Sequence, residues 1–242
     1  MRILGHRGAS SDAPENTLAA FQLALAQGAD GVELDARLCG SGEVVVFHDE
    51  RLERLTGAAG RVAETPWSTL GRLEVRAGPP GAAPGRIPLL SEVLEALPRS
   101  AFINVELKSE SWRTAAVAEA AGELLLAGRH EGHVVVSSFD LRCLLRLALS
   151  HPRIRRGLLL DPDRPQLPQR ALALPLVGRD AVHPEASRVS EADVRHWHAT
   201  GREVAVWTVD DPDVARRLRA WGVDSLITNR PGALRKALGA ER

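Results

Sequence analysis

The stretch Gly31-Val-Glu-Leu-Asp-Ala-Arg-Leu38 indicates a buried β-strand that carries two carboxylates on one face. Residues i and i+2 of a strand point to the same side, so Glu33 and Asp35 are expected next to each other. Strand-like runs recur on both sides of this stretch, and they alternate with segments in which apolar residues have helical spacing. Repeated strand–helix units predict parallel strands joined by crossover helices.

Eight strand signals fit into the 242 residues. They are Arg2–Leu4, Gly31–Leu38 with Val44–Phe47, Phe102–Leu107, Val134–Val136, Gly157–Leu160, Ala181–Val182, Val204–Thr208 and Ser225–Ile227. The expected helices are Thr17–Gln27, Leu90–Leu97, Arg113–Ala127, Leu141–Leu149, Glu191–Thr200, Pro212–Trp221 and Pro231–Leu238. This pattern predicts an α/β fold, a single closed (β/α)8 TIM barrel. The competing architecture is an open doubly wound sheet, which usually has fewer strands at this length.

One segment, from about residue 50 to 87, interrupts the alternation. It is rich in Gly, Pro and Arg and predicts at most a short helix near Thr65–Leu73. Because it follows the second strand signal, we expect a short excursion on the face of the barrel that carries active sites. A segment of about 38 residues buries little core alone, so residues 1–242 are predicted to form one domain. Asn16 is placed to cap the first helix.

Composition narrows the possible partners. Lys plus Arg and Asp plus Glu each number 31, and this balance argues against a nucleic-acid partner. No apolar run approaches the roughly 18 residues of a membrane span, and Met1–Gly8 leave no room for a signal segment. Cys39 and Cys143 lie in apolar settings, which is typical of free thiols in a reducing compartment, so we expect a cytoplasmic protein of unknown oligomeric state.

A second strand-like run, ending in Val-Glu-Leu-Lys, again places charges on one face. Glu106 then joins Glu33 and Asp35, and buried carboxylates that repel one another are typical of a cation site. Three carboxylates form a hard oxygen cage suited to Mg²⁺ or Ca²⁺, and no Cys–His cluster argues for zinc. The alternatives are salt bridges to arginines such as Arg37 and a plain Glu106–Lys108 pair.

Lys108 and Lys236 are the only lysines of the chain, so arginine supplies almost all of its positive side chains. A lysine at the end of an apolar strand therefore suggests a site with a steric or electronic requirement that arginine does not meet. A compact ammonium can approach a phosphate oxygen where a guanidinium fork does not fit.

Two histidines follow strand signals, in Gly-His6-Arg7-Gly and in Phe-His48-Asp. The flanking glycines let the backbone approach a ligand closely, and Arg7 can clamp an anion. Histidines at strand ends on one barrel face are placed for acid–base work near neutral pH. His183 ends another strand, where it could line the pocket or support it. Trp207 is either a wall for the substrate or a core residue.

Taken together, the motifs resemble those of the glycerophosphodiester phosphodiesterase family. The likeness runs through Gly-His-Arg-Gly (5–8), Ala-Pro-Glu-Asn-Thr (13–17), Gly-Ala-Asp-Gly-Val-Glu-Leu-Asp (28–35), Val-Phe-His-Asp (46–49), Val-Glu-Leu-Lys (105–108), Ser-Ser-Phe (137–139), Val-His-Pro (182–184), Val-Trp-Thr-Val (206–209) and Gly-Val-Asp-Ser-Leu-Ile-Thr-Asn-Arg-Pro (222–231). The resemblance implies a barrel enzyme that hydrolyses glycerophosphodiesters to glycerol 3-phosphate and an alcohol with a divalent cation.

The resemblance also implies a role for each motif position. By this likeness Glu33, Asp35 and Glu106 hold the metal, His6 and His48 form the acid–base pair, Arg7 and Lys108 meet the phosphate, and Trp207 walls the glycerol. One position departs from the family pattern, because the late Ile-Thr motif commonly continues with Asp and here continues with Asn229. This difference puts in doubt only a local hydrogen-bonding role of the residue at position 229.

Charge and chemistry suggest a mechanism. Three carboxylates, Arg7, Lys108 and a divalent cation sum to one positive charge, which suits a singly charged diester and predicts strict cation dependence. We hypothesise that one histidine deprotonates the glycerol C2 hydroxyl, which attacks phosphorus, while the other protonates the departing alcohol. Water then opens the cyclic phosphate. Direct attack by water and either order of the histidines stay open.

Three alternatives remain. A related phosphodiesterase acting on lysophospholipids would need an apolar groove, for which the short excursion offers little material. A non-catalytic barrel that binds a glycerophosphodiester would not need both histidines and all three carboxylates. A phosphate-binding barrel isomerase would not need two histidines beside a carboxylate triad.

Overall fold

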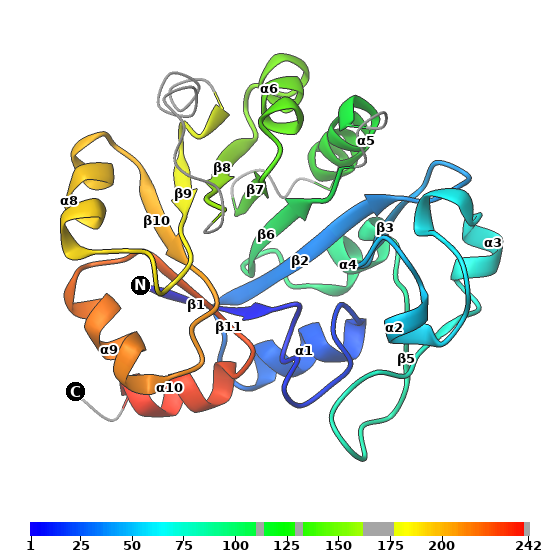
Figure 1. Ribbon diagram of the computed structural model, residues 1–242, viewed down its shortest axis with the longest axis horizontal. Coiled ribbons are helices and arrows are strands. Elements are labelled where there is room, and N and C mark those ends of the chain that lie inside the picture. The colour runs from blue at the N-terminus through cyan, green and yellow to red at the C-terminus, as the bar shows by residue number, and fades with distance from the viewer. Residues whose placement is uncertain (110–113, 129–132, 162–176, 240–242) are drawn as a thin grey trace.

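The computed structural model describes residues 1–109, 114–128, 133–161 and 177–239. Within these residues, eight parallel strands form a closed barrel (Figure 1). They are β1 (Arg2–His6), β2 (Gly31–Leu38), β6 (Phe102–Leu107), β7 (Val134–Ser138), β8 (Arg155–Leu159), β9 (Ala181–His183), β10 (Glu203–Val206) and β11 (Ser225–Thr228). Strand β1 pairs with both β11 and β2, and this closure excludes an open doubly wound sheet and confirms the predicted TIM barrel.

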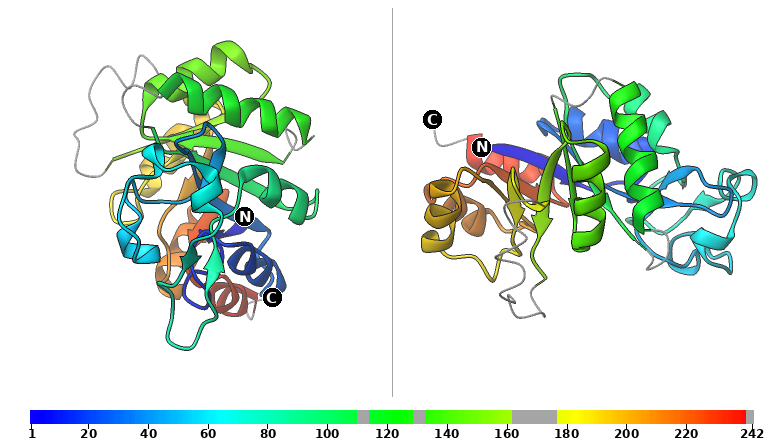
Figure 2. Two further views of the ribbon diagram at one scale, coloured as in Figure 1. Left: turned by 90° about the vertical axis from the view of Figure 1, so that its right-hand side faces the viewer. Right: turned by 90° about the horizontal axis from the view of Figure 1, so that it is seen from above.

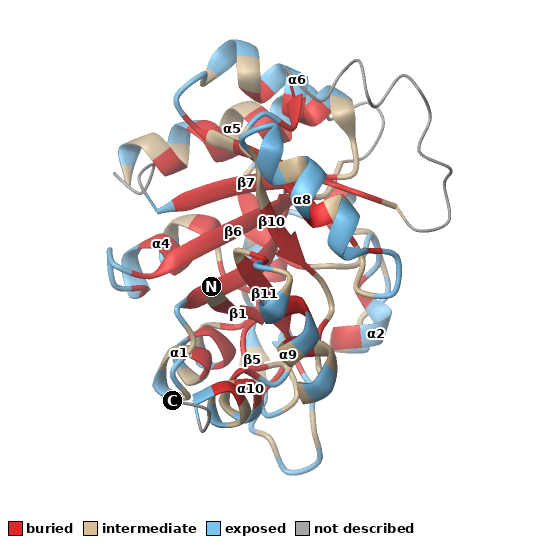
Figure 3. Ribbon diagram, turned by 90° about the vertical axis from the view of Figure 1, so that its left-hand side faces the viewer, coloured by how far each residue is buried: buried red, intermediate tan, exposed pale blue. Residues whose placement is uncertain are grey.

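Helices cover the outside of the barrel, with their buried faces toward the strands and their outer faces exposed (Figure 3). They are α1 (Leu18–Ala26), α4 (Leu90–Ala96), α5 (Thr114–Ala127), α6 (Leu141–Ser150), α8 (Glu191–Ala199), α9 (Pro212–Ala220) and α10 (Pro231–Gly239). The predicted helix at 113–127 begins at a residue outside the described ranges. None of the helices in the described part of the chain is long and apolar enough to cross a membrane.

The barrel interior changes from apolar to polar along the strands. A layer of apolar side chains fills the lower part, namely Leu4, Phe102, Val135, Ala181, Ala205 and Ile227. Two residues further along, most of the same strand faces carry polar groups, since residues i and i+2 share a face. Register aligns these groups across strands, with His6 opposite Glu33, and Asp35 opposite Glu106. The polar layer therefore lies at the carboxyl ends of the strands.

The second strand signal consists of two strands rather than one. Strand β2 continues to Leu38, and β3 (Val44–Val46) returns antiparallel to it, with Val46 opposite Ala36. His48 therefore follows a hairpin strand and not, as we predicted, the end of a barrel strand. The amide of Phe47 donates to the carbonyl of Asp35 at 2.8 Å, so the hairpin returns the chain to the level of the carboxylates.

The excursion holds more structure than the single short helix we predicted. It contains α2 (Glu53–Thr56), a 3₁₀ helix (Val62–Glu64), α3 (Trp67–Leu70) and the short paired strands β4 (Glu74–Val75) and β5 (Gly85–Arg86). Its apolar residues form a cluster together with Cys39, Val45 and Phe47 of the β2–β3 hairpin. Figures 1 and 2 place this segment on the opposite side of the barrel from α8.

Candidate active site

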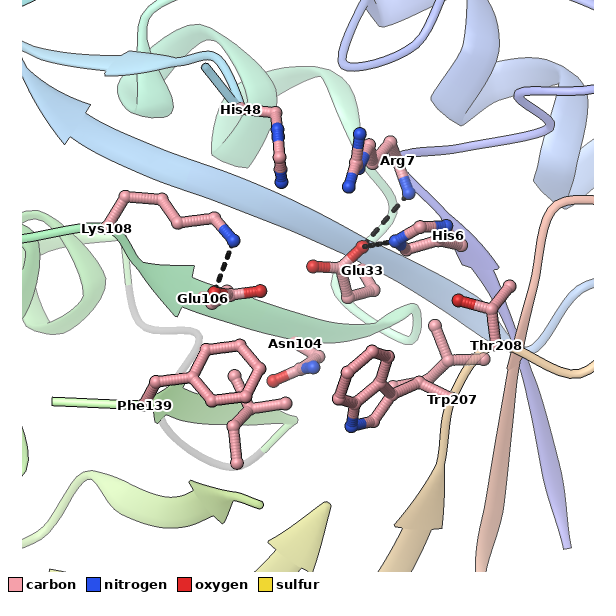
Figure 4. A pocket seen from close by; sticks show the side chains of 12 residues that line it. His6, Arg7, Glu33, His48, Asn104, Glu106, Lys108, Phe139, Trp207 and Thr208 are labelled. Atoms are coloured by element: carbon pink, nitrogen blue, oxygen red, sulfur yellow. Dashed lines mark hydrogen bonds and ion pairs between the residues drawn. The ribbon is translucent and has the colours of Figure 1, made fainter. Parts of the chain in front are cut away.

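A cavity of about 230 Å³ opens at the carboxyl ends of the strands. Its lining consists of His6, Arg7, Glu33, His48, Asn104, Glu106, Lys108, Phe139, Leu159, Trp207, Thr208 and Ile227 (Figure 4). Seven of the eight predicted site residues belong to this lining. The eighth, Asp35, is buried beside it on β2 and is 1% exposed. The fold thus brings together residues from both ends of the chain, as the prediction required.

The three predicted metal ligands lie together. Glu33, Asp35 and Glu106 each place a carboxylate oxygen within 4.8 Å of the other two. All three are buried, and the parallel pairing of β2 with β6 sets Asp35 opposite Glu106. Oxygen ligands at this spacing fit the requirements of Mg²⁺ or Ca²⁺ better than those of a softer metal.

Electrostatics shows that this cluster needs positive charge. Burial raises the pKa of Glu33 to about 8, and the Asp35 carboxylate adds to the rise. Burial likewise raises the pKa of Glu106 to about 7. Burial would also raise the pKa of Asp35, but Lys108 and Arg7 outweigh it and hold that pKa well below its usual range. Burial and mutual repulsion therefore disfavour full ionisation of the three carboxylates near neutral pH, and a divalent ion bound here would favour it.

Asp35 is held by partners on two sides. Nδ2 of Asn16 donates to Oδ2 of Asp35 at 2.8 Å, and Nζ of Lys108 lies 3.1 Å from Oδ1. Among the described residues, that Oδ1 is buried and has this ion pair but no hydrogen-bond partner, so a cation could coordinate it beside Lys108. The prediction that Asn16 caps α1 was wrong, because Thr17 is the cap and accepts from the amide of Ala20.

The turn after β1 presents Arg7 to the site. Its backbone amide donates to the carbonyl of Glu33 at 2.9 Å and to Oε2 of Glu33 at 3.0 Å. Its side chain donates to Glu15 at 2.8 Å, and Nε lies 3.2 Å from Oδ2 of Asp35. These contacts hold Arg7 in a left-handed conformation at φ 56°, which is uncommon for a residue with a Cβ.

The glycines around this turn allow close packing against α1. A Cβ on Gly5 would lie 2.8 Å from the Cβ of Ala24, and one on Gly8 would lie 2.5 Å from the backbone of Ala20. Both glycines thus let the turn pack against α1, and their close approach to a ligand stays a prediction.

Each histidine is held through Nδ1. His6 Nδ1 lies 2.7 Å from Oδ1 of Asn229, and His48 Nδ1 lies 2.6 Å from Oδ1 of Asp49. Nε2 of His6 lies 3.9 Å from Oε2 of Glu33 (Figure 4). Burial lowers the pKa of both histidines, so neutral imidazoles are favoured at neutral pH, as proton acceptors require.

Arg54 of α2 connects two parts of the rim. Its terminal nitrogens donate to both carboxylate oxygens of Glu15, the partner of Arg7. The same side chain donates to both oxygens of Asp49, the partner of His48. Glu15, Asp49 and Arg54 add one net negative charge that our sequence-based sum omitted. Without a cation the rim is therefore more negative than we predicted.

Aromatic side chains form one wall of the cavity. The rings of Phe139 and Trp207 meet edge to face with centroids 5.7 Å apart, and Nε1 of Trp207 donates to the carbonyl of His183 at 2.8 Å. Trp207 also packs against the apolar interior, so it is both wall and core. His183 does not line the cavity: its side chain is fully buried, and its backbone carbonyl supports the wall through Trp207.

The contacts of four residues in this region were not predicted, although Asn16 and Asn229 were named for other reasons. They are Asn16, Asn104, Phe139 and Asn229, and none carries a charge that would draw attention. Three of them had a signal in their position, because Asn104 lies within a strand two residues from a predicted ligand, and Phe139 and Asn229 directly follow strands.

Fold and site define a TIM-barrel enzyme for an anionic substrate, and comparison with known proteins agrees. The model of the glycerophosphoryl diester phosphodiesterase family matches residues 6–233. The chain is 33% identical to a glycerophosphodiester phosphodiesterase of Bacillus altitudinis, covering 95% of both chains. It is 32% identical to one of Caldanaerobacter subterraneus, covering 96% of this chain and 95% of the relative.

A solved structure extends the likeness to three dimensions. An Oleispira antarctica phosphodiesterase, in complex with the product sn-glycerol-3-phosphate, has a TM-score of 0.85 and 27% identity, covering 99% of this chain and 97% of that chain. The chain belongs to the glycerophosphoryl diester phosphodiesterase family. Its activity is the hydrolysis of glycerophosphodiesters.

Proposed function

We propose that His6 and His48 are the acid–base pair of this hydrolysis and that Glu33, Asp35 and Glu106 hold Mg²⁺ or Ca²⁺ beside them. The observation that carries the proposal is the shared cavity. Both imidazoles line it together with two of the carboxylates, and the third lies directly beneath. A cation in this triad would supply Lewis-acid stabilisation of charge on phosphate oxygens.

The positive side chains bind the substrate phosphate. Arg7 and Lys108 line the cavity on either side of the triad, and each is also paired with a carboxylate that fixes its position. Their charges counter the charge that develops on the phosphoryl oxygens during transfer. The Phe139–Trp207 wall packs against the carbon atoms of the glycerol.

The two histidines move the protons. One imidazole accepts the proton of the glycerol C2 hydroxyl as that oxygen attacks phosphorus, and the other donates a proton to the departing alcohol. Hydrolysis of the cyclic phosphate then yields glycerol 3-phosphate. A substrate that lacks the C2 hydroxyl tests this route, because unchanged turnover of such a substrate would require direct attack by water.

The size of the cavity favours small diesters. A cavity of about 230 Å³ lies below the roughly 300–1,000 Å³ of sites for larger ligands. It has room for glycerol phosphate, with the alcohol directed outward. A lysophospholipid is the second candidate substrate because four lining residues are apolar, and a higher kcat/KM for it than for glycerophosphocholine would favour it.

In the direct experiment, the enzyme is incubated with glycerophosphocholine, with and without chelator. The glycerol 3-phosphate that it releases is then detected with a phosphatase. We expect turnover to stop in the chelator and to return with Mg²⁺ or Ca²⁺, and the more effective ion identifies the metal. Full turnover in excess chelator would contradict the metal site. The cytoplasmic location stays a prediction, supported by two buried cysteines, Cys39 and Cys143, that are not joined in a disulfide.

A further inference from the structure

We propose that Asp210 and Asn229 are positioning residues that orient the His6 ring and place the hydrogen of its neutral form on Nδ1. This inference rests on the proposed acid–base role of His6. Asp210 follows β10 and Asn229 follows β11, two adjacent strands. Neither residue lines the cavity, so both act through the histidine.

The carboxylate of Asp210 decides the orientation of the Asn229 amide. Oδ1 of Asp210 accepts from Oγ1 of Thr228 at 2.8 Å and from the backbone amide of Asn229 at 2.8 Å. Oδ2 accepts from Nδ2 of Asn229 at 2.6 Å. Because a carboxylate only accepts, the group that faces it must be the amide NH₂ and not the amide oxygen.

The opposite end of the amide then decides the tautomer of His6. Oδ1 of Asn229 lies 2.7 Å from Nδ1 of His6 and accepts from Oγ of Ser10 at 2.8 Å. An amide oxygen cannot donate, so Nδ1 must carry the hydrogen. In the neutral ring the lone pair is consequently on Nε2, the atom directed toward Glu33 and the cavity (Figure 4).

His48 reaches the same arrangement by a shorter route, since its Nδ1 lies 2.6 Å from the carboxylate of Asp49. At His6 a neutral amide intervenes between the ring and the carboxylate of Asp210. A carboxylate at position 229 would instead face that of Asp210 across a contact that is 2.6 Å in length. The pair thus orients His6 without placing a second negative charge beside it.

The tautomer can be observed directly. Long-range ¹H–¹⁵N correlation spectra of the ¹⁵N-histidine-labelled, Mg²⁺-loaded enzyme at about pH 8 distinguish the two neutral tautomers. The signals of His6 are assigned by their loss in His6→Gln. We expect the proton on Nδ1. A proton on Nε2 in the wild-type enzyme would overturn the proposal.

A reciprocal exchange tests the two positioning residues. In Asp210→Asn, one amide oxygen replaces two carboxylate oxygens that accept three hydrogen bonds, so the Asn229 amide loses its fixed orientation. We expect mixed tautomers at His6 and a roughly 10- to 100-fold lower kcat with little change in KM. The double variant Asp210→Asn/Asn229→Asp restores a carboxylate–amide pair with the same total charge, and we expect it to recover the Nδ1–H tautomer and much of kcat.

Two further results separate the possible explanations. Ser10→Ala removes the other donor to Oδ1 of Asn229 and leaves the Asp210 contact, so the tautomer should not change. Equal or greater loss in the double variant than in Asp210→Asn, with both proteins folded by circular dichroism, would overturn the positioning role. Undiminished turnover in His6→Gln would overturn the proposed acid–base role instead, while the spectra would still decide the tautomer.

Discussion

Nζ of Lys108 lies 3.1 Å from Oδ1 of Asp35 and also pairs with Glu106, so this ammonium contacts two of the three carboxylates proposed to hold the cation. The ammonium partly neutralises the triad, and the pKa of Lys108 is raised because Asp35 and Glu106 outweigh its burial. The same group lines the cavity and is available to the substrate phosphate. It therefore opposes metal binding electrostatically while it favours substrate binding.

Lys108→Met should separate these two effects. We expect kcat/KM to fall roughly 10- to 100-fold, since a hydrogen bond to a charged group is worth about 1.5–3 kcal/mol. Metal affinity should rise, because the substitution removes a positive charge beside Asp35 and Glu106. Calorimetric titration with metal and steady-state kinetics give both quantities, and Lys108→Arg is the matched control that keeps the charge. A variant with lower metal affinity would contradict this account.

Arg54→Met should reduce kcat by about tenfold, the lower end of the range typical of indirect partners of a site. The substitution releases Glu15 and Asp49 together, so Arg7 and His48 both lose the support behind them. Stability should change by less than about 1 kcal/mol, because the Arg54 side chain is 48% exposed and exposed ion pairs contribute little.

The matched control for that variant is Arg51→Met on the same excursion. Arg51 pairs with Glu53 and its side chain is 60% exposed, away from the cavity lining. Its kcat should equal that of the wild type. Equal losses in the two variants would indicate a general effect of charge on this surface rather than a specific bridge.

Metal binding should also stabilise the fold. A ligand that binds only the folded state at 100 times its Kd adds about 2.7 kcal/mol to the free energy of unfolding. We expect Mg²⁺ or Ca²⁺ to raise the thermal midpoint of the wild type, and Glu106→Gln to require a higher concentration for the same rise. Glu123→Gln, on the exposed face of α5, should respond like the wild type. An identical metal response in Glu106→Gln would remove Glu106 from the ligand set.

The barrel and its charged site were predictable because both leave strong local signals. Buried strands such as Gly31–Leu38 are mostly apolar, so the carboxylates of Glu33 and Asp35 stand out in the sequence. Their meeting with Glu106 follows from the fold, since parallel strands bring their carboxyl ends to one rim.

The parts that escaped prediction depend on contacts between distant segments. The β2–β3 hairpin looked like one strand because the direction of the chain after Leu38 leaves no trace in apolar periodicity. Asn16 and Asn229 are neutral, and their partners Asp35 and His6 are distant in sequence, so only the folded chain reveals that they position site residues.

His183 provides a test of the interior through pH. Burial, with a smaller effect of Arg2, lowers the pKa of His183 to about 3, whereas the unfolded chain has an ordinary value near 6.5. Below pH 6.5, His183 is therefore protonated in the unfolded state but stays neutral in the folded state. The contribution of His183 to stability is intact above that pH and is lost progressively as the pH falls toward the folded pKa.

His183→Leu should remove this acid sensitivity. Between pH 7 and pH 5, protonation of His183 in the unfolded state lowers the free energy of unfolding by about 2 kcal/mol. Urea unfolding at both pH values measures the loss for each protein, and we expect the loss in the variant to be smaller by that amount. The difference between the two proteins isolates His183, because His6 and His48 also have lowered pKa values and titrate equally in both. An equal loss of stability in the two proteins would mean that the folded state accommodates a charged His183. A charged ring would need a hydrogen-bond partner, and neither ring nitrogen has one among the described residues.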